Sequence, residues 1–274
     1  MSEDKGIITE LGAESSYGGY LGLEQLLGAQ RPRSSHHDEM LFIVQHQVSE
    51  LWMKLMIHEL AAAIGHVRDD RLEPCFKILA RVKQVQRQLF EQWAVLETLT
   101  PSEYAEFRDV LGPASGLQSF QFRAIEFLLG HKTAQRVELH RFDKEKAAYL
   151  ERLLASPSLY DEYLRYLARR GFPVPPERVE RDWSQPYAMH PGVVEVFKTV
   201  YQDPQSYWAE YDMCEKLVDV EENFQLWRFR HVKTVERIIG FKRGTGGTAG
   251  VAFLRKTLEI SLFPELIEVR THLG

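Results

Sequence analysis

The stretch Val220–Gly250, VEENFQLWRFRHVKTVERIIGFKRGTGGTAG, is the part of the sequence from which the rest can be interpreted. Its large apolar residues and one histidine recur at spacings of three and four, which places them on one face of a helix. That face carries Phe224, Trp227, His231, Val235 and Ile238. Gly240 stands where a glycine commonly ends a helix, and a basic, glycine-rich loop follows it. The stretch therefore predicts a helix with a histidine inside its apolar face.

The residues alone leave two interpretations of His231 open. A histidine on an apolar face is often a core residue with one nitrogen satisfied. Here, however, the face is wide enough for a flat ligand, and the glycine loop allows close approach of the backbone. A haem has an apolar macrocycle, two carboxylates and an iron that accepts a histidine. Its carboxylates could meet the cations around the apolar face, which are Arg228, Arg230, Lys233 and Arg237.

Composition limits the class of protein. The 274 residues approach the upper limit for one hydrophobic core, and a net charge of -5 argues against nucleic acid as the main partner. The two cysteines, Cys75 and Cys214, are far apart and are interpreted as inert buried thiols, so we expect a cytoplasmic protein. No apolar run is long enough to span a membrane, and no targeting segment is recognised.

The first half of the chain predicts long helices. Residues 1–16 are expected to form a flexible tail and residues 17–274 a single domain. Helices are predicted over Glu39–Val67, with Asp38 as N-cap, and over Glu73–Leu99. The first of these has an expected core face made of Leu41, Val44, Val48, Leu51, Leu55 and Ala62. A second, mixed face carries Phe42, His46, Ser49, Glu50 and Met53. The second helix has an expected stripe of Val82, Val85, Leu89, Trp93 and Leu96.

The remaining segments support an all-α fold. A helix capped by Thr100 or Ser102 is expected to carry Tyr104 and Arg108 on one face, before a break at Leu111–Gly116. Further helices are expected at about 117–130, within 131–171, over 193–218 and over 254–262. Prolines predict an irregular stretch at 171–192, and a loop is expected from Phe263. Tyr17–Leu27 contains an expected Gly-Gly turn. It is either a surface loop or an arm laid across another subunit.

Several familiar kinds of site are excluded because the sequence lacks their motifs. The glycine loop lacks the Gly-Lys-Ser/Thr end of a phosphate loop and follows a helix, which also excludes a dinucleotide fingerprint. The sequence contains no His-Glu-x-x-His zinc motif, no Glu-x-x-His pair of a di-iron bundle and no Cys-x-x-Cys-His. A non-covalent cofactor held by histidine remains.

Four segments carry a resemblance to a known family: FIVQHQVSELW from Phe42, PSEYAEFRDVLGPASG from Pro101, FQLWRFRH from Phe224 and GFKRGTGG from Gly240. They resemble the tryptophan 2,3-dioxygenases, and the similarity extends over nearly the whole chain. The resemblance implies an all-α fold with long antiparallel helices, a homotetramer and one haem b per subunit. It implies that the substrates are L-tryptophan and O2, and that the product is N-formyl-L-kynurenine. This is the first step of tryptophan catabolism by the kynurenine pathway.

The resemblance also implies roles for individual residues. His231 would be the proximal ligand of the haem iron, and Ser115, Gly116 and Trp93 would lie against the haem. The run Phe42, Ile43, Val44, Gln45 and His46 would contact the substrate. His46, the catalytic candidate, would lie near the indole N–H as an orienting contact. Tyr104 and Arg108 would hold the substrate carboxylate, and Thr245 the ammonium. Tyr17, Tyr20 and Leu21 would reach the active site of a neighbouring subunit.

Three of these residues also have a simpler interpretation. Arg108 could be a surface cation, Tyr104 half-buried packing, and His46 a helix histidine paired with Glu50. Two other classes of protein also share these features. One is a haem-based gas sensor or carrier, and the other is a cofactor-free helical scaffold in which His231 is part of the core.

Overall fold

The computed structural model describes residue 12 and residues 16–274. The regular structure in this part of the chain is helical and contains no strand, so the predicted all-α class is confirmed. No helix within it is long and apolar enough to cross a membrane. The predicted flexible tail, residues 1–16, lies outside the described residues apart from positions 12 and 16.

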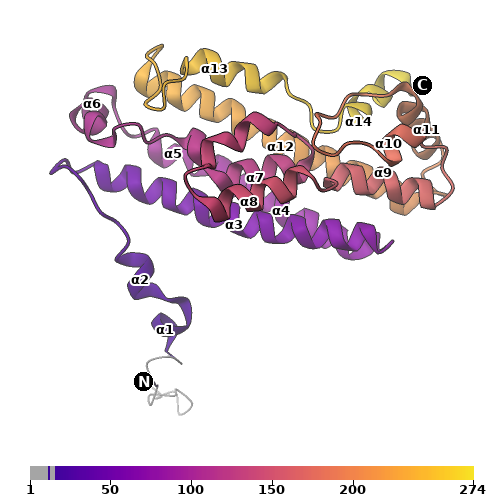
Figure 1. The fold of residues 1–274 in the computed structure, drawn as a ribbon, viewed down its shortest axis with the longest axis horizontal. Helices are drawn as coiled ribbons and strands as arrows, with labels where there is room; N and C mark the ends of the chain where they lie inside the picture. The colour runs from indigo at the N-terminus through magenta and orange to yellow at the C-terminus, as the bar shows by residue number, and fades with distance from the viewer. Residues whose placement is uncertain (1–11, 13–15) are drawn as a thin grey trace, which may run out of the picture.

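The helices follow one another through short turns and 3₁₀ segments. They are α1 (Tyr17–Leu21), α2 (Leu23–Leu27), α3 (Glu39–Arg68), α4 (Leu72–Glu91), α5 (Trp93–Leu96), α6 (Pro101–Arg108), α7 (Phe120–Leu129), α8 (Lys144–Leu154), α9 (Leu159–Arg169), α10 (Pro176–Val179), α11 (Pro191–Gln202), α12 (Trp208–Ile239), α13 (Val251–Lys256) and α14 (Pro264–Glu268). The long helices α3, α4 and α12 run along the body, with α6 at one end and α11 and α14 at the other (Figure 1).

The central helix α4 packs against both α3 and α12. Its apolar residues Val82, Val85 and Leu89 are buried, as their spacing predicts. The helix is shorter than the predicted Glu73–Leu99, because the chain leaves it at Gln92 and then forms the separate helix α5. The Gln92 side chain donates a hydrogen bond to Ser49 Oγ on α3, at 2.8 Å. This contact comes from tertiary structure and has no sequence signal.

The boundaries of α3 agree with the prediction to within one residue, but its predicted core face is partly wrong. Val44, Leu51 and Ala62 are exposed. The buried apolar residues are instead Met53, Met56, Leu60, Ala63, Ile64 and Val67. Because α3 has apolar side chains around much of its circumference, periodicity does not single out one face. The packing of α4, α7 and α9 against the helix makes that choice.

The N-terminal ends of α3 and α6 differ in their capping. Asp38 occupies the predicted N-cap position of α3, but its side chain accepts no capping hydrogen bond. The Glu39 carboxylate, in the first turn, accepts the backbone N–H groups of Arg33 and Ser34, each at 2.7 Å, which ties the preceding connector to the helix and does not cap it. At α6, Thr100 and Glu103 form the reciprocal capping box that makes Thr100 the better of the two predicted caps.

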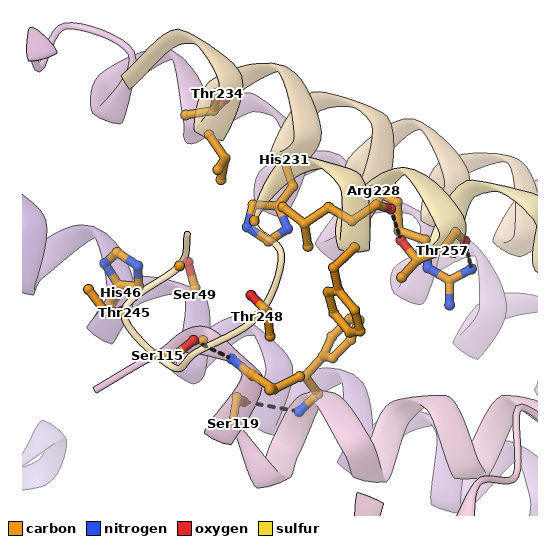
Figure 2. A pocket seen from close by; sticks show the side chains of 18 of the residues that line it. His46, Ser49, Ser115, Ser119, Arg228, His231, Thr234, Thr245, Thr248 and Thr257 are labelled. Atoms are coloured by element: carbon orange, nitrogen blue, oxygen red, sulfur yellow. Dashed lines mark hydrogen bonds between the residues drawn. The ribbon is translucent and has the colours of Figure 1, made fainter. Parts of the chain in front are cut away.

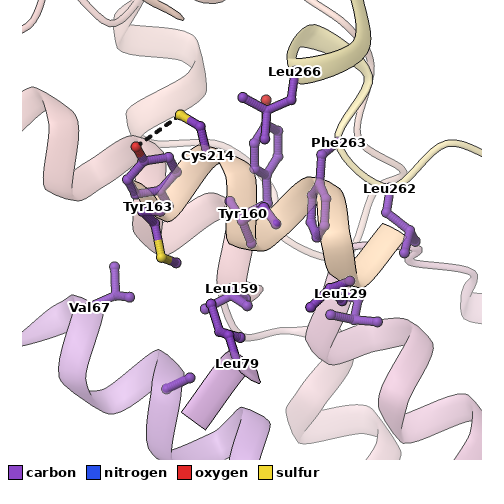
Figure 3. Packing of buried hydrophobic residues seen from close by; sticks show 14 of the residues in the cluster. Val67, Leu79, Leu129, Leu159, Tyr160, Tyr163, Cys214, Leu262, Phe263 and Leu266 are labelled. Atoms are coloured by element: carbon purple, nitrogen blue, oxygen red, sulfur yellow. Dashed lines mark hydrogen bonds between the residues drawn. The ribbon is translucent and has the colours of Figure 1, made fainter. Parts of the chain in front are cut away.

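The main core continues through α9 towards α11 and α14, where it includes buried tyrosines (Figure 3). The Tyr160 hydroxyl donates to the Glu265 carboxylate at 2.8 Å, and the Tyr163 hydroxyl donates to the Glu210 carbonyl at 2.7 Å. Both cysteines are free and buried, as predicted, and burial raises the pKa of Cys75 to about 11 and of Cys214 to about 12. Such thiols stay protonated and unreactive near neutral pH.

Four boundary predictions in the C-terminal part of the chain are wrong. The expected helix 193–218 is two helices, because Pro204 falls in the turn between α11 and α12. The irregular stretch contains the short helix α10, and the expected loop after Phe263 contains α14. Pro264 occupies the first turn of α14, a position that proline favours. The expected helix 254–262 begins earlier, at Val251, and ends in a 3₁₀ turn at Glu259.

The N-terminal helices α1 and α2 extend away from the body (Figure 1). The expected Gly-Gly turn is wrong, because Gly18 and Gly19 lie inside α1; the turn comes at Gly22, whose φ of 61° suits glycine. Neither helix has a buried residue. The segment is therefore held mainly by its connection to α3.

Candidate functional site

One cavity of about 280 Å³ lies among α3, α5, α6, α7, α12 and the loop before α13. Figure 2 shows His231 reaching into it from α12 and His46 from α3. Nine of the predicted site residues line it, namely Phe42, His46, Trp93, Tyr104, Arg108, Ser115, Gly116, His231 and Thr245. Residues as far apart in the sequence as Phe42 and Thr245 are thus brought to one site.

The His231 imidazole packs against two indole rings, those of Trp93 and Trp227, which also contact each other with centroids 6.1 Å apart. Its imidazole stacks on Trp93 with ring centroids 4.9 Å apart and planes inclined by 14°, and Trp227 lies 5.6 Å away on the same helix. Burial, and then the neighbouring His46, lower the pKa of His231 to about 4. Within the described residues neither ring nitrogen makes a hydrogen bond to the protein. The side chain is a neutral imidazole with a free lone pair, as a metal requires.

His46 has a defined tautomer. Its Nδ1 lies 2.7 Å from the carbonyl oxygen of Phe42, one turn earlier on α3. A carbonyl can only accept, so Nδ1 carries the proton and Nε2 is the acceptor. Burial lowers the pKa of His46, although the Phe42 carbonyl and Glu50 oppose the shift. The expected partner Glu50 accepts a hydrogen bond from Gln121 at 2.8 Å, so a simple His46–Glu50 pair does not account for the site.

Aromatic rings form the wall beside His46. Phe42 lies 4.2 Å from the His46 ring and 5.9 Å from the Tyr104 ring, centroid to centroid. Phe107, which is fully buried, contacts both Phe42 and Tyr104 edge to face. Burial raises the pKa of the Tyr104 hydroxyl, and the nearby Arg108 partly offsets this. This wall offers a flat apolar surface with one hydroxyl and one cation at its edge.

The loop after α12 closes over the α6 side of the cavity. Arg108 donates to the carbonyl of Arg243 at 2.6 Å, and Thr245 Oγ1 donates to the carbonyl of Ala114 at 2.5 Å. At Gly246 a Cβ atom would come within 2.7 Å of the Ser115 side chain, so only glycine fits there. These contacts bring Thr245 beside Arg108 and Ser115 at the cavity.

A buried cluster of charges forms the α7 side of the cavity. Glu126 lies between Arg123 and Arg228, with Arg228 Nη2 at 3.2 Å and His131 Nδ1 at 3.3 Å from its carboxylate. Despite burial, which acts to raise it, the pKa of Glu126 is lowered by Arg123, His131 and Arg228. Arg228 thus faces a protein carboxylate. Of the other cations expected to face a ligand, Arg230 pairs with Glu97 and Lys233 with Glu236.

Sequence reasoning missed Arg123 and Glu126. The signal was present, because the two charges stand three residues apart within the otherwise apolar helix FQFRAIEFLL. Charged residues are almost never fully buried unless they are paired. An ion pair inside such a run therefore marks either a cavity or a structural cluster, and here it marks both.

The structure does not bring the remaining predicted residues to the cavity of this chain. Ile43, Val44 and Gln45 lie on the first half of α3 but do not line it. Tyr17, Tyr20 and Leu21 lie on α1, with exposed fractions of 76%, 85% and 43%. In a single chain these side chains have nothing to cover them.

Fold and site together define an all-helical protein with a histidine-bearing, largely apolar cavity. The sequence profile of the tryptophan 2,3-dioxygenase family matches residues 1–158 and 190–273. A tryptophan 2,3-dioxygenase of Serratia proteamaculans is 62% identical over 273 residues, covering 99% of this chain and 98% of that protein. One from Myxococcus xanthus is 62% identical, covering 98% and 94%, and one from Xanthomonas campestris is 56% identical, covering 99% and 92%.

The chain therefore belongs to the tryptophan 2,3-dioxygenase family, which makes it an oxidoreductase of the dioxygenase class.

Proposed function

We propose that this cavity is the active site at which the chain inserts both atoms of O2 across the indole C2–C3 bond of L-tryptophan. The product is N-formyl-L-kynurenine, which begins tryptophan catabolism by the kynurenine pathway. The observation that carries the proposal is the neutral His231 in one cavity with His46, Tyr104 and Arg108. The family of the chain supports the choice of substrate.

The residues around the cavity fit one haem b per subunit. His231 offers a neutral imidazole as iron ligand, and Leu96, Phe122 and Ile238 provide apolar surface. At the α7 side, Arg136 supplies positive charge for a carboxylate, whereas Arg123 is already paired with Glu126, and Trp93, Ser115 and Gly116 remain the proposed neighbours of the ring. When bound, the haem would supply the oxygen-binding chemistry that no amino-acid side chain provides.

The side chains would position tryptophan by both charged ends. A guanidinium binds a carboxylate through two parallel hydrogen bonds, so Arg108 would hold the substrate carboxylate, with the Tyr104 hydroxyl beside it. Thr245 would accept a hydrogen bond from the ammonium. These contacts fix the angle of the indole in the cavity, which is where an enzyme gains most from orientation.

His46 would orient the indole ring. Its Nε2 is the acceptor and can take a hydrogen bond from the indole N–H, while Phe42 packs against the ring. An indole N–H is a very weak acid, so a histidine with a lowered pKa is poorly matched to remove its proton. Ile43, Val44 and Gln45 share the turn of α3 that carries Phe42 and His46, but because they do not line the cavity we propose no substrate contact for their side chains.

We also propose that the enzyme is a homotetramer with long antiparallel helices and a single domain over residues 17–274. The exposed Tyr17, Tyr20 and Leu21 support an arm that covers a neighbouring subunit's site, because bulky side chains on short helices gain stability when covered. The exposed Val44 and Leu51 of α3 offer further apolar surface for another subunit. Cytoplasmic location remains our proposal, and the two free buried thiols are compatible with it.

Two measurements test this function. His231→Ala should fold and lose most of its haem, because Trp93, Trp227 and Val235 offer no replacement ligand; full haem occupancy in that variant would remove His231 from its role. Adding tryptophan to the ferrous wild type in air should yield N-formyl-L-kynurenine. A haem spectrum without turnover would identify a gas sensor or carrier. No haem spectrum after haem-supplemented expression would indicate a cofactor-free scaffold.

A further inference from the structure

Glu97 joins the segment that carries Trp93 to the turn that carries His231. Its carboxylate accepts Arg230 Nε at 3.1 Å and Arg230 Nη2 at 3.0 Å, a two-bond geometry that fixes direction as well as distance. It also accepts the hydroxyl of Thr234 at 2.9 Å. Arg230 and Thr234 stand one residue before and three residues after His231 on α12, so the carboxylate is bound to the same turn as the imidazole.

The helix that carries Trp93 needs such an anchor. α5 has four residues, and a helix this short is not stable by itself. Its start is held to α3 by the hydrogen bond from Gln92 to Ser49 Oγ, and Glu97 follows its last residue, Leu96. The Trp93 indole N–H is buried without a hydrogen-bond partner, so no polar contact of the ring itself fixes its position.

No hydrogen-bond partner among the described residues orients the His231 ring. Histidines that bind metals usually donate their second N–H to a carboxylate or carbonyl, which sets the ring orientation. Among the described residues His231 has no such partner, and its ring contacts the stacked indole of Trp93 and the tilted indole of Trp227. The orientation of the imidazole therefore depends on where Trp93 is held.

We propose that Glu97 is a positioning residue for His231: by binding Arg230 and Thr234 it fixes α5 and presses the Trp93 indole against the imidazole, in place of a direct hydrogen bond. This rests on the proposed function, in which His231 binds the haem iron. Glu97 itself does not line the cavity, so its effect must pass through neighbours that do, which are Trp93 and Thr234.

The test compares Glu97→Gln with Asp219→Asn. Asp219 lies on the same helix, twelve positions before His231, and its ion pair with Lys83 at 2.8 Å ties α12 to α4. Its side chain is 34% exposed, close to the 25% of Glu97, but it accepts one hydrogen bond where Glu97 accepts three. Thermal unfolding of both variants measures the resulting difference in stability, against which the two readouts are compared.

The first readout uses the cofactor-free protein. A stacked indole shifts the NMR signals of the His231 ring protons upfield. Glu97→Gln should move them back toward unstacked values, whereas Asp219→Asn should leave them in place. Arg230→Lys keeps the charge but loses the two-bond geometry, so it should give an intermediate shift. Unchanged ring-proton shifts in Glu97→Gln would overturn the proposal.

The second readout uses the haem-loaded protein. The iron–histidine stretching band should broaden or shift in Glu97→Gln, and haem should dissociate roughly 10- to 100-fold more readily, the usual effect of removing a partner that orients a metal ligand. Asp219→Asn should match the wild type. If His231→Ala keeps its haem, the proposed function fails. If His231→Ala loses haem while Glu97→Gln behaves like Asp219→Asn, only the role of Glu97 fails.

Discussion

The Nδ1 atom of His46 lies 2.7 Å from the carbonyl oxygen of Phe42, so two side chains of the cavity are connected through one turn of α3. The hydrogen bond fixes the protonated nitrogen and leaves Nε2 as an acceptor. The ring planes of the two residues are inclined by 40° with centroids 4.2 Å apart. An aromatic wall and an acceptor are thus set at a constant angle before any substrate enters.

His46→Ala should lower kcat/KM for tryptophan without abolishing turnover. Loss of one orienting hydrogen bond costs about 1–1.5 kcal/mol, which corresponds to roughly 10-fold. The control substrate is 1-methyltryptophan, which lacks the indole N–H and should lose much less activity in the variant. Complete inactivity of His46→Ala with normal haem content would instead identify His46 as an obligatory base.

The pH profile should follow the lowered pKa of His46. Burial disfavours the charged imidazole, so the acceptor form persists below the ordinary pKa of about 6.5. As pH falls from 8, kcat/KM should therefore stay level to about 6.5 and decline only in more acidic solution. His46→Gln, which offers a non-titrating amide, should flatten that acidic limb. A midpoint above 6.5 that disappears in His46→Gln would contradict the direction of the shift.

Arg108→Ala should weaken tryptophan binding by about 2 kcal/mol, the lower part of the range for leaving a charged partner alone, because Arg108 is only half-buried. The tryptophan affinity of Arg108→Lys should lie between those of Arg108→Ala and the wild type, since lysine keeps the charge but cannot form two parallel hydrogen bonds. Haem content should stay normal. Tryptamine, which has no carboxylate, should be a poor substrate of the wild type and lose little more in Arg108→Ala. Equal losses for both compounds would show that Arg108 supports the fold.

Deleting residues 1–22 should raise the KM for tryptophan while leaving the helical circular dichroism of the body intact. The deletion removes α1, whose side chains contribute nothing to the buried core. Deleting only residues 1–11 retains Tyr17, Tyr20 and Leu21 and serves as the control. Unchanged tryptophan kinetics in the longer deletion would exclude a shared active site.

Lys132 should make stability depend on pH in the alkaline range. The side chain is 1% exposed, and its ammonium donates to the carbonyls of Leu153 and Ser156. Burial lowers its pKa from 10.5 to about 8. Between these values the unfolded chain binds a proton that the folded chain does not, so this contribution to stability decreases as pH falls from about 10.5 to about 8.

The size of that contribution is about 3–4 kcal/mol at most, at about 1.4 kcal/mol per pKa unit. Urea unfolding at pH 8 and pH 10 measures it, and the difference between wild type and Lys132→Met isolates it from other titrating groups. The wild type should gain stability relative to the variant as pH rises. An equal pH slope in the two proteins would show that the ammonium is not penalised by burial.

The sequence by itself determined the helical class and much of the site. Spacings of three and four place Phe224, Trp227 and His231 on one face of α12, and the helix follows because such a face must be buried. Local signals also sufficed where a single turn decides the structure, as with the Thr100 cap and the stop at Gly240. The identity of the proposed substrate came from the resemblance of four long motifs to a known family, because residue spacing does not encode it.

Tertiary structure alone decided which residues of α3 are buried and where α4 ends. It also decided that Glu97 and Glu126 form ion pairs with Arg230 and Arg228 of α12. Val44 and Leu51 satisfy the same periodicity as the buried Met56 and Leu60, yet only contact with α4, α7 and α9 chooses between them. Glu97 meets Arg230 across 133 positions and Arg228 meets Glu126 across 102. A local pattern cannot specify such pairs, because each depends on how separate helices are placed in space.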